Sequence, residues 1–236
     1  MNTVLNIVRI NLSLLGLLIG LGSFGQDRTI QVGVENQIPA GWIVRDTASG
    51  DLNKDGLADL ILVAQSDNKA DYKTDNDSFG SDSINANKRL IYIFLNGQKG
   101  LKLFSKVDDI IPEHVSPTMD DPYAGISINN GILQVGYYFW ANAGSWYMYS
   151  TDYKFRFQNG DFYLIGIEHD NTHRGSGERE TISVNFSTRK VNIQKFNPHL
   201  DDDKATSSEW KTFELEKLYK IPEVIPTNIK VLDNYL

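Results

Sequence analysis

Pairs of short apolar runs separated by turn-forming residues recur through the second half of the chain, and they constrain its fold most strongly. Asn-Gly between two such runs is the strongest short-range signal of a β-hairpin, because both residues tolerate the backbone of a tight turn. The sequence places Asn130-Gly131 and Asn159-Gly160 in this way, and a third pair of runs flanks residues 187–190. The paired runs are residues 126–128 and 132–139, 153–157 and 162–167, and 181–186 and 191–196.

These hairpins predict an all-β fold in which antiparallel hairpins form a β-meander. At most one short helix is expected, near the C-terminus, where a Ser and apolar residues at near-helical spacing occupy residues 208–219. Further strands are expected at residues 29–34, 42–44, 60–63, 90–95 and 101–104.

Residues 51–59 carry the clearest chemistry. Oxygen-bearing side chains occupy alternate positions, and Gly56 follows the third of them, where a tight loop must turn sharply. Calcium prefers roughly 6–8 oxygen ligands at about 2.3–2.6 Å, which such a loop can supply. An EF-hand is excluded because its position-12 Glu is replaced by Leu62. The alternative is a solvated turn without metal, since Asp, Asn and Gly dominate turns in general.

A loop of this kind that runs directly into an apolar strand resembles the FG-GAP or VCBS-type repeat, over residues 50–63, GDLNKDGLADLILV. A propeller would repeat this signature in about four blades or more, and the chain has one copy. We therefore expect one propeller-blade-like unit. The later half, with YKFRFQNGDFYLIGIEHD at residues 153–170 and SVNFST at residues 183–188, is similar to secreted bacterial proteins that pair one such repeat with a β-rich region and have no settled biochemical role. The resemblance implies Ca²⁺ held by the side chains of Asp51, Asn53, Asp55 and Asp59 and the carbonyl of Leu57.

The first 25 residues have the pattern of a signal peptide. Arg9 precedes a mostly apolar stretch at residues 10–21, and small residues precede a cleavage site near Gly25 and Gln26. As a helix the stretch would span about 18 Å, too short for a bilayer core of about 30 Å. We expect a secreted or periplasmic protein with no membrane span after signal removal; a retained anchor or a buried helix is the alternative.

Composition suggests how the remaining chain is divided. Residues 26–106 are predicted to form the calcium-loop unit, residues 107–124 a connection that contains three prolines, and residues 125–236 the β-meander. Residues 66–87 are rich in Asp, Asn, Ser and Lys and predict a long, disordered-like loop. A second calcium site in this loop is a weaker alternative to a solvated loop, because the spacing of its acidic residues does not repeat the motif. These are Asp67, Asp71, Asp75, Asp77 and Asp82.

Aromatic side chains are concentrated between residues 137 and 163. Strand alternation places Tyr153, Phe155 and Phe157 on one face, as expected of a packed core. The aromatic residues that flank the small loop of residues 141–145 are candidates for ligand binding and not for core packing. Exposed rings on a loop can stack on sugars or anchor a protein partner. They are Trp140, Trp146 and Tyr147.

Other candidate chemistry is weaker. His169 and His173 have the spacing of a zinc pair on a helix, although the residues between and after them have the pattern of a loop. Four carboxylates near one turn leave a hydrolase as a minor alternative. No nucleophile elbow, phosphate-binding loop or dinucleotide fingerprint occurs in the sequence. The four carboxylates are those of Glu168, Asp170, Glu178 and Glu180.

The sequence therefore predicts a secreted, calcium-stabilised binding or structural protein without catalytic activity that contacts a protein partner. A carbohydrate-binding module that uses the loop aromatics is the alternative. The chain has no cysteine, so no disulfide can stabilise the fold. Its net charge of −7 argues against nucleic acid as a partner.

Overall fold

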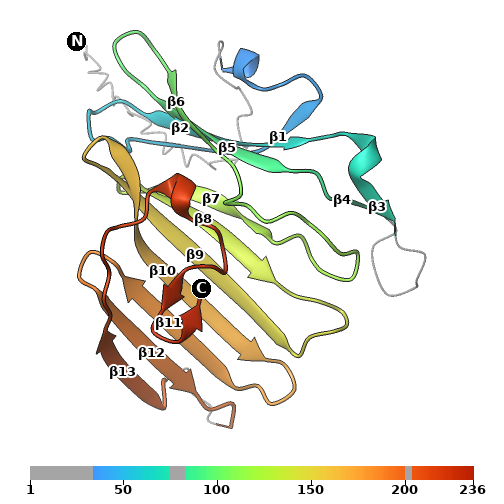
Figure 1. The fold of residues 1–236 in the computed structure, drawn as a ribbon, viewed down its shortest axis with the longest axis vertical. Helices are drawn as coiled ribbons and strands as arrows, with labels where there is room; N and C mark the ends of the chain where they lie inside the picture. Colours follow the sequence, from blue (N-terminus) through green and yellow to red (C-terminus); the bar gives the residue numbers. More distant parts are fainter. Residues whose placement is uncertain (1–33, 75–82, 200–203) are drawn as a thin grey trace, which may run out of the picture.

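The computed structural model describes residues 34–74, 83–199 and 204–236, and these form an all-β fold of antiparallel sheets. The described part of the chain contains no helix that is long and apolar enough to cross a membrane. A four-stranded sheet has the order β1-β2-β5-β6, and a seven-stranded sheet has the order β13-β12-β11-β10-β9-β8-β7 (Figure 1). The first sheet contains β1 (Trp42–Gly50), β2 (Asp59–Ser66), β5 (Arg89–Leu95) and β6 (Lys102–Val107). The second contains β7 (Tyr123–Asn129), β8 (Ile132–Phe139), β9 (Tyr147–Gln158), β10 (Asp161–His173), β11 (Arg179–Asn185), β12 (Lys190–Phe196) and β13 (Ser207–Thr212).

The predicted hairpins are present, and their turns explain the local sequence. Asn130 and Gly131 join β7 to β8 with φ of 52° and 73°, and Asn159 and Gly160 join β9 to β10 with φ of 51° and 77°. Two successive residues with positive φ form the type I′ turn, whose twist matches that of the strands. The prediction of an all-β fold built from antiparallel hairpins is confirmed.

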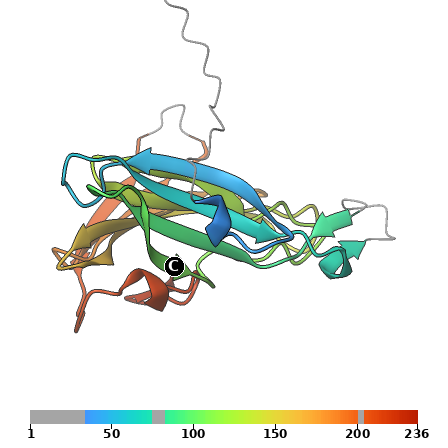
Figure 2. The same ribbon diagram turned by 90° about the horizontal axis from the view of Figure 1, so that it is seen from above.

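Two segments differ in detail from the sequence expectations. Residues 208–219 do not form a helix: the chain enters strand β13, because the open edge of β12 offers backbone partners from Lys190 to Lys195. Residues 66–87 are more ordered than expected where they are described, with the 3-10 helix η2 (Lys69–Asp71) and a hairpin of β3 (Tyr72–Thr74) and β4 (Ser83–Asn85). Figure 2 shows this hairpin extending beyond one end of the four-stranded sheet.

The N-terminal expectations are only partly covered by the structure. The signal peptide and most of the strand expected at residues 29–34 lie outside the described residues. The first described residue, Val34, is buried in a turn before the 3-10 helix η1 (Glu35–Gln37), and the strand expected from Trp42 is β1.

One apolar core joins the two sheets. Alternate residues of β2 and β5 face the seven-stranded sheet, and Leu52, Leu133 and Phe155 belong to the same buried cluster. The opposite face of β2 and β5 is covered by a smaller cluster that includes Val34. Burial on both faces explains why these strands are continuous apolar runs. The division of the chain at residues 107–124 stays a prediction.

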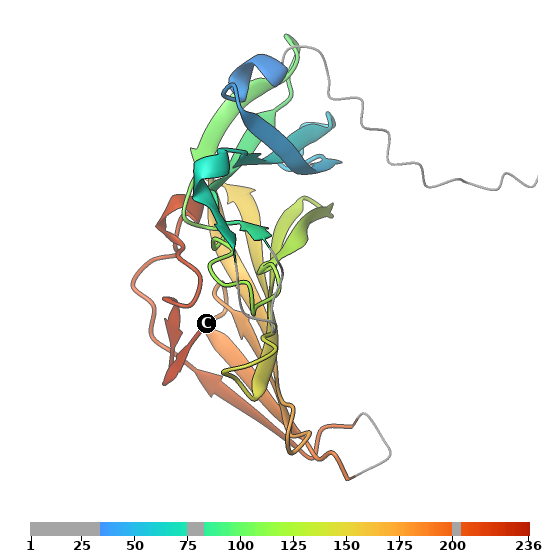
Figure 3. The same ribbon diagram turned by 90° about the vertical axis from the view of Figure 1, so that its right-hand side faces the viewer.

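The C-terminal segment covers one face of the seven-stranded sheet (Figure 3). It contains the 3-10 helix η3 (Ile221–Glu223) and a small hairpin of β14 (Lys230–Val231) and β15 (Asn234–Tyr235). Its apolar side chains complete the shared core, so this face of the sheet is closed. They include Ile221, Val224, Ile229, Val231 and Leu236.

Strands β1 and β7, the edges of the two sheets, lie against each other without a β-ladder. Asp46 connects them: its Oδ2 accepts hydrogen bonds from the Tyr123 hydroxyl at 2.9 Å and from the Ile126 amide at 3.4 Å. At the end of β1, a Cβ on Gly50 would lie 2.6 Å from Cγ2 of Ile128. Gly50 therefore allows the close approach of the two sheets.

We expect Gly50→Ala to lower the free energy of unfolding by about 1–3 kcal/mol, because the added methyl would push β1 away from Ile128. Denaturant unfolding of both proteins measures this change. The matched control is Gly97→Ala, since a Cβ there meets nothing within 4 Å and Gly97 has no positive φ. Equal losses in the two variants would contradict the close-packing argument.

Candidate calcium loop and ligand-binding surfaces

The loop between β1 and β2 turns its oxygen-bearing side chains inward. Asp51 accepts hydrogen bonds from the amides of Asp55 (3.2 Å) and Gly56 (3.0 Å). Oδ1 of Asn53 accepts from the same Asp55 amide at 3.1 Å, and Oδ1 of Asp55 accepts from the Leu57 amide at 2.9 Å. Because one N–H bonds two of these oxygens, the side chains of Asp51 and Asn53 converge on one point of the loop.

The backbone of the loop has the predicted sharp turn. Gly56 has a φ of 88° and Lys54 a φ of 64°, so the chain enters the left-handed region twice within three residues. Glycine adopts this conformation without steric cost, which is why it occupies this position. The turn directs the preceding oxygen-bearing side chains to the inside of the loop.

The donor set of this loop fits a hard cation. Asp51 and Asp55 form no ion pair with another described residue, so their negative charges are uncompensated. Carboxylate, amide and carbonyl oxygens are the ligands that Ca²⁺ prefers. Within the described ranges, no group of three or more His, Cys, Asp and Glu side chains is close enough to hold a metal. The loop instead offers two inward carboxylates and the Asn53 amide.

Asp59 has a different environment from the other predicted ligands. Its side chain is fully buried, and Oδ2 accepts hydrogen bonds from the amides of Leu52 (2.8 Å) and Asn53 (3.4 Å). Oδ1 accepts from the amide of Asn96, in the turn between β5 and β6, at 2.8 Å. Asp59 therefore closes the loop through backbone amides, and one lone pair on Oδ1 is left for a cation.

The structure separates the three predicted loop aromatics. Trp140 is half-buried, with the Arg174 guanidinium 5.2 Å from its ring centroid. The side chains of Trp146 and Tyr147 are 67% and 51% exposed, and their rings lie 6.4 Å and 4.9 Å from the ring of His173. Trp146, Tyr147 and His173 thus form an exposed aromatic platform, and Trp140 is not part of it.

Arg174 holds the loop that carries this platform. Its backbone amide donates to the carbonyl of Trp146 at 2.7 Å, and its guanidinium donates to the carbonyls of Ala141 (2.9 Å) and Ser145. The turn between β10 and β11 therefore positions residues 141–147, and the platform does not depend on loop residues alone.

A polar cleft of about 720 Å³ opens beside the platform. The sequence prediction missed it, because its walls come from β10, β11 and β12 and meet only through strand register. In the described part of the chain, the buried Oδ1 of Asn171 at this cleft has no hydrogen-bond partner. The cleft is lined among others by Tyr147, His173, Glu178, Glu180, Phe196 and His199.

An apolar groove of about 540 Å³ lies between the 107–124 connection, strands β8 and β9, and the C-terminal segment. Tyr137, Tyr149 and Tyr153 contribute to its lining, and burial raises the pKa of each phenol, to about 12 for Tyr153. All three are therefore neutral at physiological pH. Val115 and Ile225, which are about half exposed, lie on its two sides. No sequence pattern pointed to this groove, since its parts are far apart in the chain.

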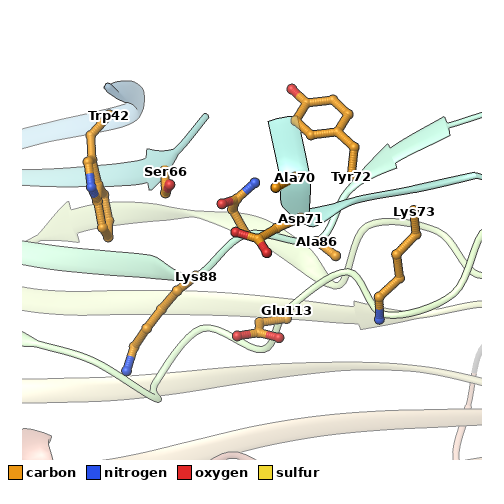
Figure 4. Close-up of a pocket in the computed structure, with 10 residues that line it drawn as sticks. Trp42, Ser66, Ala70, Asp71, Tyr72, Lys73, Ala86, Lys88 and Glu113 are labelled. Atoms are coloured by element: carbon orange, nitrogen blue, oxygen red, sulfur yellow. The ribbon is translucent and has the colours of Figure 1, made fainter. Parts of the chain in front are cut away.

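A third hollow, of about 590 Å³, lies where η2 and β3 meet Glu113 of the 107–124 connection. Figure 4 shows its lining, with Asp71 and Glu113 between Lys88 on one side and Lys73 on the other. Charges of both signs make this a polar surface without preference for an anion or a cation.

The acidic residues proposed for a second calcium site are only partly described. The Asp67 carboxylate accepts hydrogen bonds from Lys69 Nζ (2.8 Å) and the Tyr72 hydroxyl (2.7 Å), which hold its pKa below the usual value. Oδ2 of Asp71 accepts a hydrogen bond from the side-chain Nδ2 of Asn68 at 2.9 Å. The other three, Asp75, Asp77 and Asp82, lie outside the described residues.

The predicted zinc pair is not brought together. His169 and His173 lie along one strand, β10, where four residues span about 13 Å, too far to share one ion. Nδ1 of His169 is instead 2.8 Å from the Thr151 hydroxyl, and burial lowers the pKa of His169 from its usual 6.5. Nδ1 of His173 is 2.9 Å from the Ser176 hydroxyl.

The candidate hydrolase carboxylates are also dispersed. Strand alternation places Glu168 and Asp170 on one face of β10, and Glu180, paired with Asn171, on the other. Glu178 lies in the turn between β10 and β11, where it accepts a hydrogen bond from Ser176. The other three form ion pairs: Glu168 with Lys154, Asp170 with Arg179 and Glu180 with Lys195.

Comparison of the chain with protein-family models, with curated proteins and with solved structures finds no match.

We expect Asp59→Asn to lower the free energy of unfolding in calcium-free buffer by about 1–3 kcal/mol, because an amide nitrogen cannot accept a hydrogen bond from a buried backbone N–H. Asp55→Asn is the control. Because Asp55 is exposed, this substitution should lower the free energy of unfolding by no more than about 0.5 kcal/mol. Denaturant unfolding with excess chelator measures both. A loss for Asp59→Asn no larger than that for Asp55→Asn would contradict the structural role of Asp59.

Proposed function

We propose that the protein is a secreted, calcium-stabilised binding protein without catalytic activity that contacts a protein partner. The observation that carries this proposal is the convergence of the Asp51 and Asn53 oxygens on the Asp55 amide, with Asn53 Nδ2 donating to the Asp55 carboxylate at 2.9 Å, in a loop at the junction of the two sheets. The predicted signal peptide supports an extracellular or periplasmic location, where calcium is abundant.

Calcium in this loop would neutralise two uncompensated carboxylates. Asp51, Asn53 and Asp55 would hold the ion, with the carbonyl of Leu57 and the remaining lone pair of Asp59 completing the set. The loop anchors Leu52, which is buried in the shared core, and the Asp51 carbonyl lies close to Gly131 in the turn between β7 and β8. An ordered loop would therefore hold the two sheets in one arrangement.

The apolar groove supports a protein as the partner. It exposes Val115 and Ile225 above a floor of neutral tyrosine rings, a surface that apolar side chains of another protein can fill. Glu113 at its rim is exposed and forms no ion pair with a described residue. The surface thus suits a partner segment with apolar side chains next to a basic residue.

We expect calcium to raise the melting temperature of residues 26–236 by about 5–10 °C relative to excess chelator. A free calcium concentration of about 100 times the dissociation constant adds about 2.7 kcal/mol to the free energy of unfolding. In a protein of this size, each kcal/mol raises the melting temperature by about 2–4 °C. Asp55→Ala should abolish the rise, because it removes a ligand. Lys54→Ala should preserve it, because Lys54 is exposed and its charge repels the ion. A melting temperature indifferent to calcium, or equal effects of the two variants, would refute the calcium site.

Carbohydrate binding is a second candidate, favoured by the aromatic platform beside the polar cleft. An exposed indole and phenol offer flat apolar faces to a sugar ring, and the cleft offers carboxylate, amide and imidazole groups to its hydroxyls. The partnerless Oδ1 of Asn171 is an acceptor that a sugar hydroxyl could satisfy.

If the platform binds glycans, Trp146→Ala should lower the affinity for a soluble glycan selected on an array by at least about tenfold, because truncating an aromatic anchor at a binding surface typically costs about 2 kcal/mol or more. Trp210→Ala is the matched control, since Trp210 is also 67% exposed but lies on β13, away from the cleft. Absence of glycan binding, or equal losses in the two variants, would leave the protein partner as the better proposal.

A further inference from the structure

Strand β13 differs from the other strands of the seven-stranded sheet because all six of its side chains are exposed. Its hydrogen-bonded neighbour is β12, and it ends the order of the sheet (Figure 1). Among the described residues, no strand pairs with its outer edge. Trp210, at the middle of the strand, exposes 67% of its side chain.

The opposite edge of the same sheet is protected. Strand β7 lies against β1, and the Asp46 carboxylate bonds the Ile126 amide and the Tyr123 hydroxyl across that boundary. An uncovered edge strand presents unpaired N–H and C=O groups that another strand can join. In the described structure this condition is met at β13 and not at β7.

The sequence of β13 is complementary to itself in an antiparallel arrangement. If a two-fold axis passes through Trp210, the two copies of Trp210 face each other, and Glu209 of each copy faces Lys211 of the other. Ser208 of each copy then faces Thr212 of the other. Opposite charges, aromatic rings and paired hydroxyls are all favourable directly across an antiparallel pair.

Within one chain, Glu209 and Lys211 already lie on the same face of β13, 3.0 Å apart. Residues directly opposite in an antiparallel pair also share a face, so a second copy would extend this pair into a square of four charges with alternating signs. Each charge would then have one neighbour of opposite sign on its own strand and one on the facing strand.

We propose that two copies of this chain associate through their β13 strands, in antiparallel register about Trp210, to form one continuous sheet. The contact is isologous, so each favourable pair other than the central one occurs twice. This inference does not depend on the calcium loop or on either ligand surface.

Sedimentation equilibrium of residues 26–236 tests the proposal with charge-reversal variants. The unmodified chain should dimerise reversibly with concentration. Glu209→Lys and Lys211→Glu should each weaken self-association by at least about tenfold, because each brings like charges opposite one another at two positions. An equimolar mixture of the two variants should form a heterodimer, since a strand with two basic residues then faces one with two acidic residues.

Trp210→Ser and Trp146→Ser provide the matched aromatic pair. Both remove an indole that is 67% exposed, and only Trp210→Ser should weaken the dimer. Unchanged melting temperatures would show that the variants fold. A chain that stays monomeric at all concentrations, a dimer insensitive to the three β13 variants, or a mixture that fails to associate would overturn the proposal.

Discussion

The carboxylate of Asp59 is the interaction on which the arrangement of the two sheets depends. It is fully buried and accepts hydrogen bonds from the amides of Leu52, Asn53 and Asn96. These bonds join the beginning and the end of the loop to the turn between β5 and β6. Because the loop is closed in this way, Leu52 is held in the core that both sheets share. Local closure of the loop and packing between the sheets are therefore one energetic unit.

A second buried charge fixes the connection between the sheets. Arg89 on β5 is 2% exposed, and its guanidinium donates two hydrogen bonds of 2.7 Å to Asp121 and one of 3.3 Å to the carbonyl of Pro112. Removing one partner of such a pair leaves an uncompensated buried charge, which costs more than the pair itself contributes. The same contacts hold one wall of the apolar groove in place. The shape of the groove thus depends on the sheet junction.

Sequence patterns predicted what is decided locally. Asn-Gly turns located two hairpins, and Gly56 located the sharp turn of the loop, because positive φ is a property of single residues. The short helix allowed at residues 208–219 does not form, because pairing with the open edge of β12 outweighed the helix-like spacing of Trp210 and Phe213. The role of Asp59 depends on Asn96, and the aromatic platform depends on the pairing of Tyr147 with His173. Both require a register that no local pattern contains.

The candidate calcium loop lies against one end of the seven-stranded sheet, and the aromatic platform lies at the other end. The loop contacts the turn between β7 and β8 near Gly131, and Ile132 after that turn pairs with Arg156 on β9. The platform begins at Tyr147, about 30 Å away at the usual rise of a strand. An ion in the loop cannot touch a ligand on the platform at this distance. It can act there only through the stability of the whole sheet, so calcium should change how much protein is folded and leave the intrinsic affinity of the platform unchanged.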